Sequence, residues 1–360
     1  MPWTLGVPLL ADESLSSWLV RAALRQGCDP LALTGAIWPG WRVWTRDVDR
    51  DIPLARLSPL VKASGIPAAK FQQAALRGAC ERINGHPLSD NRTWPWLLAL
   101  GTRNRVRHSG QQCCQLCLAQ DATPYFRREW RFAWHVGCPL HGVTLIDDCP
   151  VCQAPIEPHR LVAEDGHLSQ CSRCRFDWRH TACTPISQDT LRFQQIADEV
   201  LQANPVILGK KGVTASDWFA ATAFLLGVIR RASHRPASAL THTLRSLEIP
   251  VTEGLLPVTG LPFELLAVSE RSTLLTATQR ALDVGLVEIF AAFRKNEVMA
   301  TALHDPRKPP PMVIRSIMAT GTTHQKTPRS GLQKPHQPKS ERAVRAAWAR
   351  LQRRMKTEIP

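Results

Sequence analysis

The sequence predicts a mainly helical protein with a small cysteine-rich module in its middle. Apolar residues recur at helical spacing on both sides of residues 106–185, as expected of helices that pack one face into a core. Four pairs of cysteine or histidine fall within that range, and the chain beyond residue 303 is basic and rich in proline. We therefore expect a helical domain over residues 1–105, a double metal-binding module over 106–185, a second helical domain over 186–303 and a basic tail over 304–360.

The first expected helix covers residues 12–27. Asp12 or Ser14 can cap its start, and Gly27 is placed to end it. Its apolar residues follow helical spacing and are assigned to the core rather than to a site. They are Leu15, Trp18, Leu19 and Ala22.

Two further helices are expected over residues 53–63 and 67–82, joined by a short turn that contains Gly65. This is the shape of a helix-turn-helix unit, whose second helix enters a DNA groove. Any small helical domain can be built in the same way, so both interpretations stay open. The residues that the second helix would offer to DNA are Lys70, Gln72, Gln73, Arg77 and Arg82.

Eight potential metal ligands form the four pairs. Two residues separate the members of each pair, a spacing at which one tight turn aims both ligands at the same ion. In chain order the pairs form C-x2-C-x20-C-x2-H and C-x2-C-x18-C-x2-C, which predicts two tetrahedral zinc sites. The first would consist of Cys114, Cys117, Cys138 and His141, and the second of Cys149, Cys152, Cys171 and Cys174. Four protein ligands leave no position for a water nucleophile, so both ions are expected to be structural.

The other cysteines and one nearby histidine are expected to lie outside these sites. Disulfides are the alternative use of eleven cysteines, but the regular pairs and the lack of a secretory signal favour metal. His135 and His141 both lie two residues away from Cys138, on opposite sides, and His141 is assigned as the ligand. Cys113 could replace its neighbour as a ligand. Three cysteines are expected to be small buried residues: Cys28, Cys80 and Cys183.

Two arginine-rich stretches flank the first ligand pair. One stretch carries Arg103, Arg105 and Arg107. In the other, aromatic residues alternate with Arg127, Arg128 and Arg131. All six are candidate nucleic-acid contacts. The last three could equally pair with the acidic run Asp147-Asp148, and the sequence does not decide between the two.

The region beyond the cysteine module is expected to be helical and not to cross a membrane. Its longest apolar run, Trp218–Ile229, is too short to span a bilayer and ends at two arginines, so we expect a buried helix. With no N-terminal signal, we expect a cytoplasmic protein associated with the bacterial nucleoid. The helices expected here cover residues 190–203, 215–231, 236–247, 261–269 and 272–294.

The tail carries most of the positive charge. Residues 304–360 hold 13 Lys or Arg and three Asp or Glu, which accounts for ten of the fifteen net charges. Residues 305–339 are expected to be a disordered linker, and 340–356 a basic amphipathic helix that suits a phosphate backbone or an acidic partner. A tail that only aids solubility is the alternative. The arginines expected to contact nucleic acid are Arg345, Arg350, Arg353 and Arg354.

Several of these motifs together resemble the TniQ/TnsD family of transposon target-selection proteins, over about residues 5–180. They are the N-terminal stretch Val7-Pro-Leu-Leu-Ala-Asp-Glu-Ser-Leu-Ser-Ser-Trp-Leu-Val-Arg, the run Arg127-Arg128-Glu129-Trp130-Arg131, the element Cys138-Pro-Leu-His141-Gly142, and Cys149-Pro-Val-Cys152. The family often has Tyr-Cys-Pro at the first ligand, where this chain has Cys113-Cys114-Gln115. Arg175 follows the last ligand, where glycine would ease the turn.

The resemblance implies a non-catalytic subunit that selects a DNA target and recruits an AAA+ ATPase regulator, which in turn brings the transposase. It also implies a possible homodimer and, in RNA-guided systems, a place in a guide-RNA complex. The alternative is a free-standing helix-turn-helix transcriptional regulator that contains zinc. A metal-dependent hydrolase is disfavoured because the sequence shows no His-Glu-x-x-His element.

Overall fold

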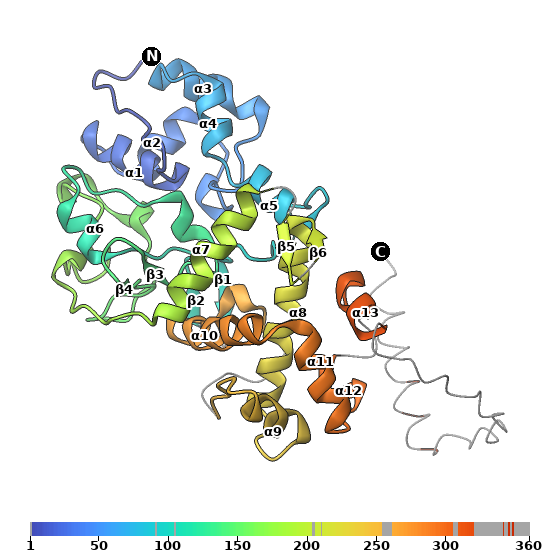
Figure 1. The fold of residues 1–360 in the computed structure, drawn as a ribbon. Coiled ribbons are helices and arrows are strands. Elements are labelled where there is room, and N and C mark those ends of the chain that lie inside the picture. Colours follow the sequence, from blue (N-terminus) through green and yellow to red (C-terminus); the bar gives the residue numbers. More distant parts are fainter. Residues whose placement is uncertain are drawn as a thin grey trace. The chain divides into compact units, whose positions relative to one another are not determined.

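Most of the regular structure is helical, as the sequence predicts (Figure 1). This computed structural model describes residues 2–90, 92–103, 106–203, 206–209, 211–253, 261–304 and 309–319, together with residues 341, 345 and 348. Residues 1–319 form one unit and residues 320–360 a second. None of the described helices is both long and apolar enough to cross a membrane.

The N-terminal helices pack around tryptophan. Helix α1 (Leu15–Arg25) begins after Ser14, whose side chain accepts a hydrogen bond from the Ser17 backbone, so the predicted helix and cap are confirmed. Trp18 is fully buried and its indole donates to the Val7 carbonyl at 3.0 Å. The other elements of this region are α2 (Pro30–Ile37), the 3-10 turn η1 (Val43–Thr45), α3 (Leu54–Ser64) and α4 (Ala68–Ala74).

The prediction of a single helix over residues 67–82 is wrong, because the helix is interrupted at Ala75. Helix α4 ends there in extended backbone, and α5 (Arg77–Asn84) starts two residues later. The two helices serve different cores: Phe71 packs with the N-terminal helices, whereas Leu76 and Cys80 pack with the C-terminal ones. A continuous helix would have to satisfy both cores with one apolar face.

The cysteine-rich region has little regular structure. It begins at a hairpin of β1 (Gly101–Arg103) and β2 (Val106–His108), in which Gly101 pairs with His108. Helix α6 (Gln115–Gln120) follows, and then the short antiparallel pair β3 (Gly137–Cys138) and β4 (Val143–Thr144). The remaining elements are the 3-10 turns η2 (Arg128–Arg131), η3 (Pro158–Arg160), η4 (Ala163–Asp165) and η5 (Trp178–His180).

The C-terminal region is built around α8 (Ala215–Ser233), the buried helix that the apolar run predicts. Helices α7 (Gln188–Gln202) and α10 (Val268–Val284) pack against each other, and both pack on α8 (Figure 1). The other elements are the hairpin β5 (Val206–Leu208) and β6 (Lys211–Val213), α9 (Ala239–Ser246), η6 (Phe263–Leu265), α11 (Leu286–Lys295) and α12 (Ala300–Leu303).

Two of the helices predicted in this region are wrong. Only a 3-10 turn and the first residues of α10 occupy residues 261–269. There the Glu270 side chain accepts from the Ala267 backbone amide at 2.8 Å and caps α10. The helix predicted over 272–294 is split at Gly285, whose φ of 94° is one that side-chain-bearing residues rarely adopt.

Part of the segment predicted to be a disordered linker is ordered. Helix α13 (Met312–Ala319) packs against α8 and α11, and its Val313 and Ile314 are buried. The buried apolar residues of α13 therefore order this part of the segment, although prolines precede it. The rest of the predicted linker lies outside the described residues, apart from Pro309, Pro310 and Pro311.

Apolar side chains gather in three clusters. One consists of the N-terminal helices, and a second surrounds the paired cysteines. The third and largest joins α5 and residues 94–98 and 132–136 to the helices from α7 onward. The stretch between the first two ligand pairs therefore ties the cysteine-rich region to the C-terminal helices.

Candidate metal centres and basic surfaces

The structure brings the eight predicted metal ligands together in two groups of four, with the predicted membership. Within each group the ligand atoms all lie within 4.8 Å of one another. The first group contains Cys114, Cys117, Cys138 and His141, and the second contains Cys149, Cys152, Cys171 and Cys174. Among the described residues no other set of three or more Cys, His, Asp or Glu side chains is gathered in this way.

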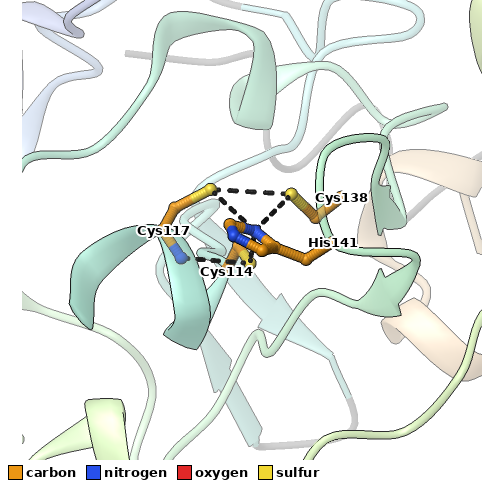
Figure 2. Close-up of side chains that lie close together, drawn as sticks. All are labelled: Cys114, Cys117, Cys138 and His141. Carbon is orange, nitrogen blue, oxygen red and sulfur yellow. Dashed lines mark hydrogen bonds between the residues drawn. The ribbon is translucent and has the colours of Figure 1, made fainter. Parts of the chain in front are cut away.

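In the first group, the ligand atoms face a common centre (Figure 2). The His141 Nδ1 atom lies 3.3 Å from the Cys138 sulfur, 3.4 Å from Cys117 and 3.5 Å from Cys114. The Cys117 and Cys138 sulfurs are 3.5 Å apart. Separations of this size are the edges of a tetrahedron around an ion with metal–ligand bonds of about 2.0–2.3 Å, which are zinc distances.

The ring of His141 is held by a second contact. Its Nε2 atom lies 2.9 Å from the Gln120 Oε1 atom, so Nδ1 is left free to face the sulfurs. Histidines that bind metal commonly donate their other ring N–H to an oxygen in this way, which fixes the tautomer and the ring plane. The residues of the first group therefore fit a zinc ion.

The second group is formed by four cysteines. The Cys149 and Cys174 sulfurs are 3.6 Å apart, as are those of Cys152 and Cys171. Burial raises the pKa of the Cys171 thiol to about 12, so a bound cation would have to displace that proton. Four soft thiolates in a tetrahedral set fit zinc and leave no open position.

Three of the four ligand turns share one backbone form. In each, the residue after the second ligand has a positive φ, and its amide donates to the carbonyl of the first ligand at 2.8–2.9 Å. These residues are Gly142, Gln153 and Arg175. The sequence led us to expect a strained turn at Arg175 alone, and Gln153 has the same strain with a φ of 55°.

The cysteines outside the two groups have varied surroundings. Cys113 is fully buried, and burial raises the pKa of its thiol well above the ordinary value. Cys80 is buried as expected and Cys28 is half-buried, but Cys183 is exposed, which corrects the expectation for that residue. His135 is buried and its Nε2 atom lies 2.9 Å from Asp198. Burial works against protonation of this ring, yet the Asp198 carboxylate outweighs it and raises the pKa.

Arg131, expected at a nucleic-acid surface, is instead a buried link between regions. Its side chain is 1% exposed and donates to the Asp47 carboxylate through two bonds of 2.7 and 2.8 Å. It also pairs with Asp49 and donates to the Leu98 carbonyl at 3.1 Å. Arg131 therefore neither faces a nucleic acid nor pairs with Asp147-Asp148, so both predictions for it are wrong. Its partners come from the N-terminal region.

The two neighbouring arginines are also held internally, though less deeply. Arg127 forms a two-bond ion pair with Asp121 at 2.9 and 3.1 Å, and its guanidinium lies over the rings of Tyr125 and Trp130. Arg128 donates to the Gln73 carbonyl at 2.6 Å. Arg127 therefore has acidic partners as one alternative foresaw, but not the predicted ones.

The residues proposed for a recognition helix are divided by the break at Ala75. Lys70, Gln72 and Gln73 lie on α4 and are exposed. Arg77 pairs with Asp51 at 2.9 Å and with Asp90, and Arg82 donates to the Ala203 carbonyl at 2.7 Å. The last two residues serve the fold, which leaves α4 as a short helix with a polar face.

The structure places the other predicted arginines only in part. The backbone of Arg103 and Arg107 lies in the β1–β2 hairpin. In the tail, Glu341, Arg345 and Trp348 are helical and exposed, and Arg345 pairs with Glu341 at 2.5 Å. Four predicted contacts fall outside the described residues: Arg105, Arg350, Arg353 and Arg354.

Sequence reasoning missed the partners that hold these sites in place. Gln120 has no pattern that marks it as a neighbour of His141, because 21 residues separate them. The alternation Asp47-Val-Asp49-Arg50-Asp51 gave a signal, since a run of acids beside a basic segment suggests paired charges. Only the fold shows that Arg131, more than 80 residues later, is the partner.

The family comparison agrees with this geometry. Residues 4–145 match the TniQ family, a range that includes the N-terminal helices and all four ligands of the first metal group. This family is associated with target selection in transposition and acts through non-catalytic adaptors. No curated protein matches the chain. The match covers less than half of the chain and agrees with the predicted resemblance to the TniQ/TnsD family.

Proposed function

We propose that this protein is an adaptor that selects DNA targets for transposition. It binds DNA and recruits an AAA+ ATPase regulator, through which the transposase reaches the chosen site. The observation that carries the proposal is the TniQ match over residues 4–145, together with a complete metal group inside that match. A catalytic role finds no support in either metal group, because each donor set fills a tetrahedron.

We further propose that both groups hold zinc and that the zinc is structural. The fixed tautomer of His141 and the repeated ligand turns support this assignment. Small regions with few secondary-structure elements commonly need such an ion, because their apolar core alone does not outweigh chain entropy.

The charge distribution of the N-terminal region supports nucleic-acid binding. All eight acidic residues among the first hundred are engaged in hydrogen bonds or ion pairs within residues 1–319. Eight exposed cations in the same stretch have no acidic partner among the described residues: Arg25, Arg42, Arg46, Arg56, Lys62, Lys70, Arg82 and Arg92. The surface charge available to a partner is therefore positive, as DNA binding requires.

Footprinting on candidate target DNA tests the DNA part of the proposal. The full-length protein is expected to protect a defined sequence, and Lys70→Ala with Gln73→Ala is expected to weaken that sequence preference. Arg294→Ala, at an exposed arginine of α11, serves as the control that leaves the α4 face intact. Equal protection of every DNA sequence would show that the protein does not select its target by contacting the bases directly.

A pull-down with AAA+ ATPases from the same genome tests the recruitment part. The tagged protein is expected to retain the ATPase in the presence of nucleotide. If no ATPase is retained and the protein binds and controls a promoter, it would instead be a free-standing transcriptional regulator. Adding the components of a guide-RNA complex to the same assay shows whether recognition is direct or RNA-guided.

A further inference from the structure

A cleft of about 520 Å³ lies between residues 41–53 and 90–100. Its lining includes Trp41, Arg46, Arg50, Arg77, Arg92 and Leu100. We propose that this cleft, the Arg46–Arg92 cleft, binds the sugar-phosphate backbone of a nucleic acid. The proposal rests on the proposed function and adds a location for the contact, away from the α4 face.

The charges of the cleft favour an anion. Three aspartates also line it, and each is held by an arginine: Asp51 and Asp90 by Arg77, and Asp47 by Arg131 from the buried side. Arg46 and Arg92 are exposed and have no carboxylate partner among the described residues. Two guanidinium groups are thus available at the rim, and their donor geometry suits phosphate oxygens.

Two arginines of the cleft lie against a buried tryptophan. The Arg50 and Arg77 guanidinium carbons lie 4.6 and 5.0 Å from the centre of the Trp94 ring, which is fully buried. Arg50 also donates to the Arg92 carbonyl at 3.0 Å, so it holds the rim segment in place. Burial lowers the pKa of Arg50 and Arg131 adds repulsion, against the attraction of Asp47. A phosphate in the cleft would add negative charge that stabilises the charged form of Arg50.

The test compares two double variants that each remove two exposed arginines. Arg46→Ala with Arg92→Ala changes the cleft. Arg235→Ala with Arg294→Ala is the matched control at two exposed arginines elsewhere, one in the loop after α8 and one on α11. Fluorescence anisotropy measures binding of the full-length chain to duplex DNA and to RNA over a salt series. If both arginines contact phosphate, the slope of log K against log salt for duplex DNA should become shallower by about 1.8, since each contact contributes about 0.9. The control variant should keep the wild-type slope.

The outcomes separate this inference from the proposed function. Equal slopes for the cleft variant, the control and the wild type, with DNA still bound, would overturn the cleft and leave the adaptor intact. A wild-type chain that binds neither nucleic acid would overturn both. A shallower slope on RNA alone would assign the cleft to an RNA backbone, whereas a change on duplex DNA assigns it to the target. Arg46→Lys with Arg92→Lys, which keeps the charges, should retain most of the slope.

Discussion

The two metal groups are built from similar turns but have different surroundings. In the first, the three cysteines are at most 2% exposed and the histidine is held by Gln120. In the second, Cys152 is half-buried and Cys174 is exposed. The first group also lies inside the TniQ match, whereas the second lies beyond residue 145. We therefore expect that losing the first proposed ion would disturb residues 4–145 more than losing the second.

The largest effect is expected from Cys138→Ser. Loss of one ligand should release the first zinc, and because structural zinc contributes on the order of 10 kcal/mol, residues 4–145 should unfold. Elemental analysis should give about two zinc ions for the wild type, and circular dichroism should show the loss of helix. Cys183→Ser, at an exposed cysteine outside both groups, is the control and should keep both ions. Loss of a full metal equivalent in that control would mean that the ligands are wrongly assigned.

Removing the second site should have a smaller effect on the fold. Cys171→Ser should release one zinc and expose residues 149–178 to protease, while the N-terminal helices stay protected, because all four ligands of the first group remain in place. Limited proteolysis with mass spectrometry locates the cleavage sites. We expect this variant to lose target selection although it keeps residues 4–145 folded. Equal unfolding of both variants would abolish the proposed difference between the sites.

Arg131→Ala tests the link between the first metal group and the N-terminal helices. Removing the arginine leaves Asp47 and Asp49 without their buried partner, and breaking such a pair costs about 3–5 kcal/mol. Urea denaturation followed by tryptophan fluorescence measures the free energy of unfolding. Arg128→Ala, which removes only a hydrogen bond to a carbonyl at the surface, should change it by about 1 kcal/mol or less. A similar loss in both variants would argue against the buried link.

The smallest effect is expected from Gln120→Ala, which leaves all eight ligands in place. Without the oxygen that orients His141, zinc affinity at the first group should fall by about 10-fold to 100-fold, and the second group should be unchanged. Competition with a chromogenic chelator resolves the two ions, and the second ion is the internal control. Gln120→Glu restores an acceptor and should recover the affinity. An unaltered release profile in Gln120→Ala would show that the ring is held by the fold alone.

The ligand groups could be predicted because their information is local. Two ligands on one tight turn are fixed by a spacing of two residues, so four such turns define the four pairs. The long helices α1, α7 and α8 were foreseen for a similar reason, since a 3.6-residue apolar period needs no knowledge of the partner.

Tertiary structure decided what the local signals left open. The break at Ala75 exists because Phe71 and Leu76 belong to different cores, which no periodicity reveals. Arg131 looked like a surface cation until the fold placed Asp47 and Asp49 around it. The sequence by itself determined the helical class, the TniQ resemblance and the membership of both metal groups. The tertiary structure decided which arginines are buried and which stay exposed, because a charge is neutralised by partners that are close in space, whatever their separation along the chain.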